Sequence, residues 1–285
     1  MRFRIVHETR YEYSDAVHLE PHFVRIRPRC DAFQNLVRHT LHVEPKPEGI
    51  SNGVDAEGNS YAVAWFSGPV RRLCLRAESE VDTMRVNPFH FLVTDPKALR
   101  LPVRYAEPLA RSLAPSIAGG PGDGGEALSR FVQDAEDGAN GETLQFLSRL
   151  CSEIQQKFAK VSRPTGAPHP AAVTLEQKEG ACRDLVVLYL ESVRLRGLAA
   201  RFVSGYHGEE RSDGGHELHA WAEVYLPGAG WLGYDPSLGL AVADRHIALA
   251  ASSIASRTVP VTGTFRSSTA SAAMHTRLAI DRPNG

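Results

Sequence analysis

The first 85 residues alternate apolar and polar side chains in short runs, and no helical stripe of convincing length interrupts them. Each run can bury only one face, so two layers of antiparallel strands must pack together. Asp55-Ala-Glu-Gly-Asn59 supplies residues that tolerate a tight turn between two of these strands. The pattern therefore predicts an N-terminal β-sandwich. Its expected strands are 3–13, 22–28, 36–43, 61–65 and 70–79.

The periodicity changes after residue 140. Apolar side chains recur at steps of three and four from Leu144 to Phe158, which predicts an amphipathic helix with Asn140 as its N-cap. A second helix, beginning after Gly180, is apolar on nearly every side, so we expect it to be central, buried and ended by Gly197. Further strands are expected at 199–206, 218–226 and 231–235, with 271–280 closing the same sheet.

We expect three regions from this organisation. Residues 1–90 form the β-sandwich domain, residues 91–139 a connector, and residues 140–285 an α+β domain of the catalytic type. Within the connector, residues 117–126 hold five glycines and a proline, which indicates a linker or a mobile loop.

Composition excludes several function classes. The chain has 32 basic and 33 acidic side chains and a formal charge of -1, so it lacks the concentrated basic surface of a nucleic-acid or acidic-membrane binder. No apolar run approaches the ~20 residues of a membrane span, and the N-terminus lacks a signal-peptide pattern. The four cysteines show no CxxC spacing, which is typical of a reducing compartment. We expect a cytoplasmic protein with no nucleic-acid or membrane partner.

Cys182 directly precedes the expected buried helix, within Gly180-Ala-Cys-Arg-Asp184. The unpaired N–H groups and the positive dipole end at a helix start favour the thiolate, and the N–H of Cys182 is one available oxyanion donor. Gly180 permits a close approach of the backbone to a reacting carbonyl. Taken alone, however, a small buried cysteine at a helix start explains this position better.

The downstream hairpin changes that balance. His219 opens one expected strand and Asp235 ends the next. A four-residue loop would set Asp235 opposite Ala222, on the wrong face for His219. A three- or five-residue loop pairs Asp235 with Trp221 and makes His219 a diagonal neighbour, roughly 7–8 Å away between backbones. An odd-length loop or a bulge is therefore required if the two side chains are to meet.

With that geometry the roles follow from chemistry. Cys182 attacks, His219 takes its proton and returns it to the leaving group, and Asp235 fixes the imidazole tautomer. A metal site is less favoured: His216 and His219 form an HxxH pair with His207 nearby, but strand positions three apart face opposite sides. We predict neither a metal ion nor a cofactor.

Three blocks of the chain resemble the core of the bacterial transglutaminase-like proteins. They are Gly180-Ala-Cys-Arg-Asp184, Ala200-Arg-Phe-Val-Ser-Gly-Tyr206 and the hairpin from His219 to Pro236. The N-terminal region is similar to the β-domain that precedes the core in that family, and residues 258–265 resemble its tail. The resemblance implies an α+β fold, with an N-terminal antiparallel β-sandwich and a papain-like transglutaminase core. It also implies a catalytic Cys-His-Asp triad, which maps to Cys182, His219 and Asp235.

Two positions depart from the family pattern. Arg183 stands where the family commonly has glutamine, and we hypothesise that its charge lowers the pKa of the thiol or alters the substrate mouth. Cross-linking animal transglutaminases use a tryptophan upstream of the cysteine as an oxyanion donor, and this chain has none between Trp65 and Trp221. Gln177 is a weak candidate for that second donor, and a solvated loop glutamine is the favoured interpretation.

These features predict a cysteine enzyme that transfers an acyl group from a glutamine-like carboxamide or peptide carbonyl to an amine or to water. Its substrate is a protein, a peptide or a small amide. A cysteine peptidase or amidase with the same triad is one alternative, and a non-catalytic binding protein that retains the core is another. The sequence leaves the acceptor and the oligomeric state open.

Overall fold

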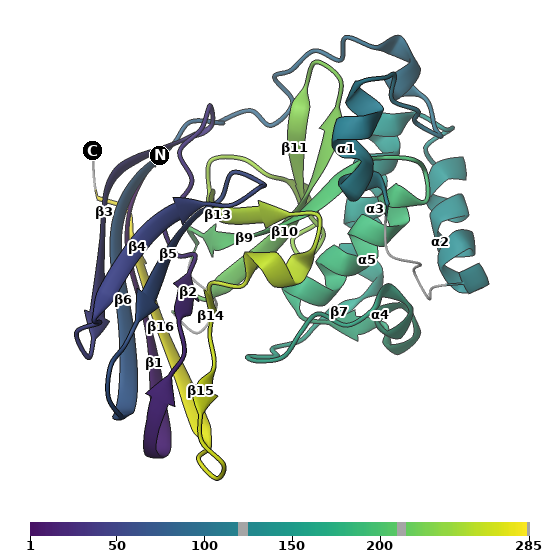
Figure 1. Ribbon diagram of the computed structural model, residues 1–285. Helices are drawn as coiled ribbons and strands as arrows, with labels where there is room; N and C mark the ends of the chain where they lie inside the picture. Colours follow the sequence, from purple (N-terminus) through teal and green to yellow (C-terminus); the bar gives the residue numbers. More distant parts are fainter. Residues whose placement is uncertain (119–124, 210–214, 284–285) are drawn as a thin grey trace.

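The computed structural model describes residues 1–118, 125–209 and 215–283, and its elements form three layers (Figure 1). The N-terminal sheets form one side of the molecule, a central five-stranded sheet lies in the middle, and the helices cover the far face of that sheet. Among the described residues, no helix is long and apolar enough to cross a membrane.

The N-terminal region is built from two antiparallel sheets. Apolar side chains at alternate positions of their strands pack into one cluster between the sheets, including Val17, Leu73 and Leu75, which are fully buried. This is the β-sandwich that the alternating pattern predicts. The first sheet holds β15 (Phe265–Arg266), β1 (Arg2–Leu19), β6 (Val70–Thr83) and β3 (Gln34–Glu44), with β16 (Ala272–Asp281) also on β1. The second holds β14 (Val261–Thr262), β2 (His22–Val24), β5 (Ser60–Trp65) and β4 (Gly49–Val54).

The central sheet carries the apolar core of the second region. Its strands run in the order β12 (Leu240–Ala241), β11 (Gly230–Asp235), β10 (Leu218–Leu226), β9 (Ala200–His207) and β13 (His246–Ser252). Alternate residues of β10, such as Ala222 and Val224, pack against the helices in one cluster. The helices are α1 (Leu109–Ile117), α2 (Gly125–Asp137), α3 (Thr143–Lys157), α4 (Ala171–Gln177) and α5 (Cys182–Arg194).

Shorter elements connect these parts. Two-residue strands β7 (Ala159–Lys160) and β8 (Glu179–Gly180) pair in parallel just before α5. Single 3-10 turns lie at η1 (Pro96–Leu99) and η2 (Ala255–Thr258). The β7–β8 pair fixes the chain immediately upstream of Cys182.

The N-terminal sandwich also supports strand β13 at the edge of the central sheet. The Asn59 side chain accepts a hydrogen bond from the Ala251 N–H and donates one to its carbonyl, both at 2.8 Å. Gln34 does the same at Ala248, at 2.8 and 3.0 Å. Two buried side-chain amides thus satisfy backbone groups that an edge strand leaves open.

Three expectations from the sequence are wrong in detail. Residues 271–280 do form a strand, but β16 pairs with β1 instead of closing the central sheet. Asn140 does not cap α3, because it adopts a left-handed conformation (φ 50°) in the turn before Glu142, which is the N-cap. Helix α5 ends at Arg194 with Leu195 as its C-cap, and Gly197 follows at φ 75°.

Other elements were not located by the sequence pattern, although the connector was expected to be helical and glycine-rich. Strand β4 buries none of its residues, so it carries no alternation of buried and exposed positions. Helices α1, α2 and α4 lie where the sequence pattern is weak or interrupted by glycine and proline. Of the glycine-rich stretch 117–126, residues 119–124 lie outside the described residues, and Gly125 begins α2.

Candidate functional site

Cys182 is the first residue of α5, and a buried carboxylate holds the turn before it. Asp184 is fully buried and accepts hydrogen bonds from the N–H groups of Ala181, at 2.8 Å, and His169, at 2.7 Å. The Arg163 guanidinium lies 2.5 Å from the same carboxylate. Asp184 therefore connects the N-terminus of α5 to the upstream segment that contains Arg163 and His169. The first N–H groups of a helix have no partner within the helix, so α5 itself leaves the N–H of Cys182 available to a ligand at this end.

Gly180 is required by the packing of this turn. A Cβ added there would lie 2.9 Å from the Cβ of Asp184 and 3.4 Å from the Thr174 side chain. The sequence argument assigned this glycine to the approach of a reacting carbonyl. In the structure, the close neighbour that excludes a side chain is Asp184.

The hairpin register fulfils the condition set by the sequence. Leu226 pairs with Gly230, so the loop has three residues, and the ladder continues to Ala222 opposite Tyr234. One further step sets Trp221 opposite Asp235, which makes His219 the diagonal neighbour of Asp235. The side chains meet, and His219 Nε2 lies 2.5 Å from Asp235 Oδ2.

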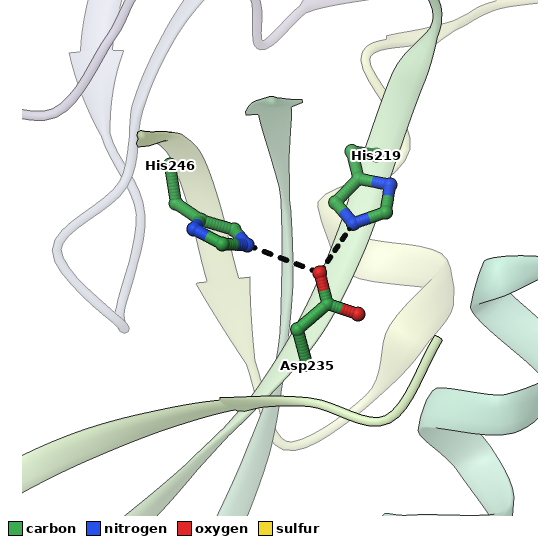
Figure 2. A group of neighbouring side chains, drawn as sticks. All are labelled: His219, Asp235 and His246. Atoms are coloured by element: carbon green, nitrogen blue, oxygen red, sulfur yellow. Dashed lines mark hydrogen bonds and ion pairs between the residues drawn. The ribbon is translucent and has the colours of Figure 1, made fainter. Parts of the chain in front are cut away.

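Asp235 is fully buried and accepts hydrogen bonds on both oxygens, and Figure 2 shows the two histidines that share one of them. Oδ2 accepts from His219 Nε2 at 2.5 Å and from His246 Nε2 at 3.0 Å. Oδ1 accepts from the Ser237 N–H and hydroxyl, at 3.0 and 2.8 Å, and from the Leu238 N–H at 3.3 Å. These donors fix the orientation of the carboxylate.

The same contacts set the charge states. Burial alone raises the pKa of Asp235, but attraction to His219 and hydrogen bonds from His219 and His246 outweigh it and hold that pKa well below its ordinary value. Burial lowers the pKa of His219, and Asp235 reverses this, so the pKa of His219 rises to about 10. The two groups therefore form a buried imidazolium–carboxylate pair.

Cys182 completes this row of side chains. An interaction with the Cys182 side chain also contributes to the raised pKa of His219. Because His219 Nε2 is engaged by Asp235, Nδ1 is the ring nitrogen left for the sulfur. The pKa of His219 thus responds to both Asp235 and Cys182, the two partners that the sequence predicts for it. Such an arrangement can activate a thiol and shuttle its proton.

The remaining candidates from the sequence are less engaged. The Arg183 guanidinium donates to the Thr165 carbonyl at 2.7 Å. Gln177 is exposed at the end of α4, and β8 separates it from Cys182. Arg201 pairs with Glu223 at 2.6 Å, and Asp184 pairs with Arg163. Most of the charged loop 208–215 lies outside the described residues.

One group of described residues has donor atoms near enough to hold a metal ion. His219, Asp235 and His246 each offer a ligand atom within 4.8 Å of the others. The HxxH pair, His216 and His219, does not form such a group with His207 or Cys182 in the described part of the chain. Hydrogen bonds to Asp235 Oδ2 already account for the way both imidazoles point.

His246 is the residue of this group that the sequence argument missed. It opens β13, an apolar strand with the sequence His-Ile-Ala-Leu-Ala-Ala-Ser, and no spacing rule links it to Asp235. The available signal was a polar side chain at the start of a strand that is otherwise buried.

The comparisons with known proteins place this geometry in a family. Residues 3–82 match the bacterial transglutaminase-like N-terminal region, and residues 129–236 match the transglutaminase-like superfamily. An uncharacterised protein of Mycobacterium tuberculosis is 31% identical over 260 residues, covering 86% of this chain and 82% of that one. The chain belongs to the transglutaminase-like superfamily. The family resemblance and the expected fold class are thereby confirmed.

Two further similarities bear on this transglutaminase-like protein. The crystal structure of a presumed cysteine protease from Cytophaga hutchinsonii covers 100% of this chain and 92% of its own, with a TM-score of 0.73 and 17% identity. It supports the papain-like fold. A protein-glutamine gamma-glutamyltransferase of Pseudomonas aeruginosa is 28% identical over 127 residues, covering 41% of this chain and 19% of that one. The superfamily is usually enzymatic and includes both kinds of protein.

Proposed function

We propose that this protein is a cysteine acyltransferase that uses Cys182 as its nucleophile, His219 as its acid and base, and Asp235 as the partner of His219. The thiolate attacks the carbonyl carbon of a glutamine-like carboxamide or peptide bond in a protein or peptide. The carbon–nitrogen bond breaks, and His219 gives its proton to the departing ammonia or amine. The product is a thioester on Cys182.

An amine or water then attacks the thioester. His219 takes the proton of the attacking group as the carbon–sulfur bond breaks, which restores the thiolate and the imidazolium and releases an amide or an acid. The N–H of Cys182 at the start of α5 is positioned for the oxyanion, because that end of a helix carries unpaired donors.

The observation that best supports this proposal is the contact of His219 with two partners. Its Nε2 lies 2.5 Å from Asp235, and its other side interacts with the Cys182 side chain. Of the four cysteines, Cys151 is buried and burial raises its pKa well above the ordinary value, so it is unsuited to attack. Only the sulfur at position 182 combines a helix start with an imidazole and a carboxylate.

A glutamine-containing peptide, with and without a primary amine, tests the proposal by mass spectrometry. Incorporation of the amine shifts the peptide mass by the amine less ammonia, and hydrolysis of the carboxamide adds about one unit. Cleavage of the peptide chain would assign peptidase chemistry to the same residues. Whichever of these products the wild type forms should disappear in Cys182→Ala and persist in the matched control Cys30→Ala. Product formation that survives in Cys182→Ala would refute the proposal.

A further inference from the structure

Two histidines from different strands bind the same oxygen of Asp235. His219 comes from β10 and His246 from β13, and Figure 2 shows both rings directed at the carboxylate between them. Both Nε2 atoms reach Oδ2, at 2.5 and 3.0 Å. The mechanism proposed above uses His219 and leaves the function of His246 open.

His246 must donate its hydrogen bond, because Asp235 is an ionised carboxylate and has no proton to give. Its side chain is 2% exposed, and its Nδ1 is buried with no hydrogen-bond partner among the described residues. A protonated ring would bury an unpaired N–H at Nδ1, which is costly. The contacts therefore favour a neutral ring with its single proton on Nε2.

The surroundings of His246 agree with a neutral ring. His207 on β9 lies against it with 4.7 Å between ring centroids, and Trp221 on β10 lies 5.1 Å away. The ionisable groups that face it are His207, His219 and Asp235, and Arg245 acts on His207. Burial lowers the pKa of His246, and it lowers the pKa of His207 to about 3. Within the described residues around Asp235, the positive charge thus resides on His219.

His246 is also held in place by the N-terminal sandwich. Strand β13 begins at His246, and the amides of Gln34 and Asn59 bind its backbone at Ala248 and Ala251. Gly205 of β9 leaves room beside this strand, since a Cβ there would lie 2.2 Å from the Ile247 carbonyl. The N-terminal sandwich, β13 and β9 together therefore fix the position of the His246 ring.

We propose that His246 is a positioning residue, which holds Oδ2 of Asp235 in the place where it accepts the Nε2 proton of His219. This role rests on the function proposed above. Because His246 shares the oxygen, it also draws negative charge away from His219. Asp235 then orients the imidazole without holding its proton so strongly that transfer to a leaving group becomes slow.

Two substitutions of His246 separate a positioning role from simple packing. His246→Gln keeps an amide N–H near the position of Nε2, and His246→Leu keeps bulk without a donor. His207→Leu is the matched control, since it removes a ring of the same cluster that touches His246. The readout is the turnover rate of the glutamine peptide, which requires proton transfer to the leaving group. Alkylation of Cys182 by iodoacetamide and thermal unfolding are measured alongside it for each variant.

We expect His246→Leu to slow turnover of the glutamine peptide by roughly tenfold or more, the effect of losing one hydrogen bond to a charged group. His246→Gln and His207→Leu should keep most of the turnover rate. Equal losses in His246→Leu and His246→Gln, in step with their thermal unfolding, would make His246 a packing residue and overturn the proposal. Slow alkylation of Cys182 in the wild type would instead count against the proposed function.

Nitrogen-15 NMR of labelled histidine tests the same arrangement without any reaction. The wild type should show His246 as the neutral Nε2–H tautomer at pH 7. In His246→Leu, Asp235 loses a donor and becomes more basic, so the pH at which His219 loses its proton should rise. An Nδ1–H tautomer for His246, or an unchanged His219 titration, would contradict the proposal. Zinc bound at this group and released by a chelator would also overturn it, in favour of a cation site.

Discussion

Leu226 pairs with Gly230 at the end of the β10–β11 hairpin, which leaves a loop of three residues. Side chains along a strand alternate between faces, so the parity of this loop decides whether Asp235 shares a face with His219. The observed parity places Asp235 Oδ2 2.5 Å from His219 Nε2. The proposed chemistry therefore depends on the length of a loop that contains none of the reacting groups.

Inserting one alanine between Ala229 and Gly230 should separate Asp235 from His219. The insertion reverses the parity of β11 relative to β10, so we expect activity to fall by up to about 10⁴-fold, the effect of disabling the aspartate of a catalytic triad. Inserting two alanines restores the parity and is the matched control. Steady-state rates with the glutamine peptide measure both. Equal activity in the two insertion variants would contradict the role assigned to the register.

Acid should destabilise the protein partly through His7. This buried side chain connects β1 to β9, with Nδ1 2.8 Å from the Tyr206 hydroxyl, and burial lowers its pKa to about 4. Between pH 6.5 and 4 the unfolded chain, with a histidine pKa of about 6.5, binds a proton at His7 that the folded chain does not bind. Stability that is complete above pH 6.5 is therefore lost as the pH falls towards 4, at about 1.4 kcal/mol per pH unit.

Urea unfolding at several pH values measures this loss. His7→Gln should show a shallower fall in the free energy of unfolding between pH 6.5 and 4 than the wild type. The exposed His18 provides the matched control, His18→Gln, which should follow the wild type. A wild-type slope in His7→Gln would show that His7 does not carry this effect.

Asn59→Ala should destabilise the protein through strand β13. The substitution leaves the buried N–H and carbonyl of Ala251 without their partners, at a cost of roughly 2–4 kcal/mol in the free energy of unfolding. Asn52→Ala, at an exposed position of β4, is the control and should change stability little. Denaturant titration of both variants provides the measurement. A loss no larger than that of the control would show that the amide does not support β13.

The sequence was sufficient for the local features of the site and insufficient for its long-range partners. The apolar helix after Gly180 and the β10–β11 hairpin follow from patterns within a few residues. The odd loop length was a condition set by the proposed contact of His219 with Asp235, and the structure meets it. The pairing of β16 with β1 does not follow from such a pattern, because alternation indicates a strand but does not identify the strand it pairs with. His246 was missed for the same reason, since its bond to Asp235 depends on β13 pairing with β9.

Some local details also escaped sequence reasoning. Asparagine is a preferred residue type at an N-cap, but Asn140 adopts φ 50°, because the chain turns through Gly141 before α3 begins. Gly180 was assigned to substrate approach, although the side chain of Asp184 is what excludes a Cβ. In both cases the residue type was informative, and the competing contact became visible only in three dimensions.

Competitive alkylation of the four cysteines tests the central claim most directly. At pH 7 a limiting amount of iodoacetamide, with peptide mass analysis, ranks their reactivities in the folded protein. Exposure alone favours Cys30, which is exposed, over the half-buried Cys182. Activation by His219 predicts the reverse order, with Cys182 labelled first and its advantage lost in His219→Gln. Labelling of Cys30 ahead of Cys182 in the wild type would contradict an activated nucleophile at this site.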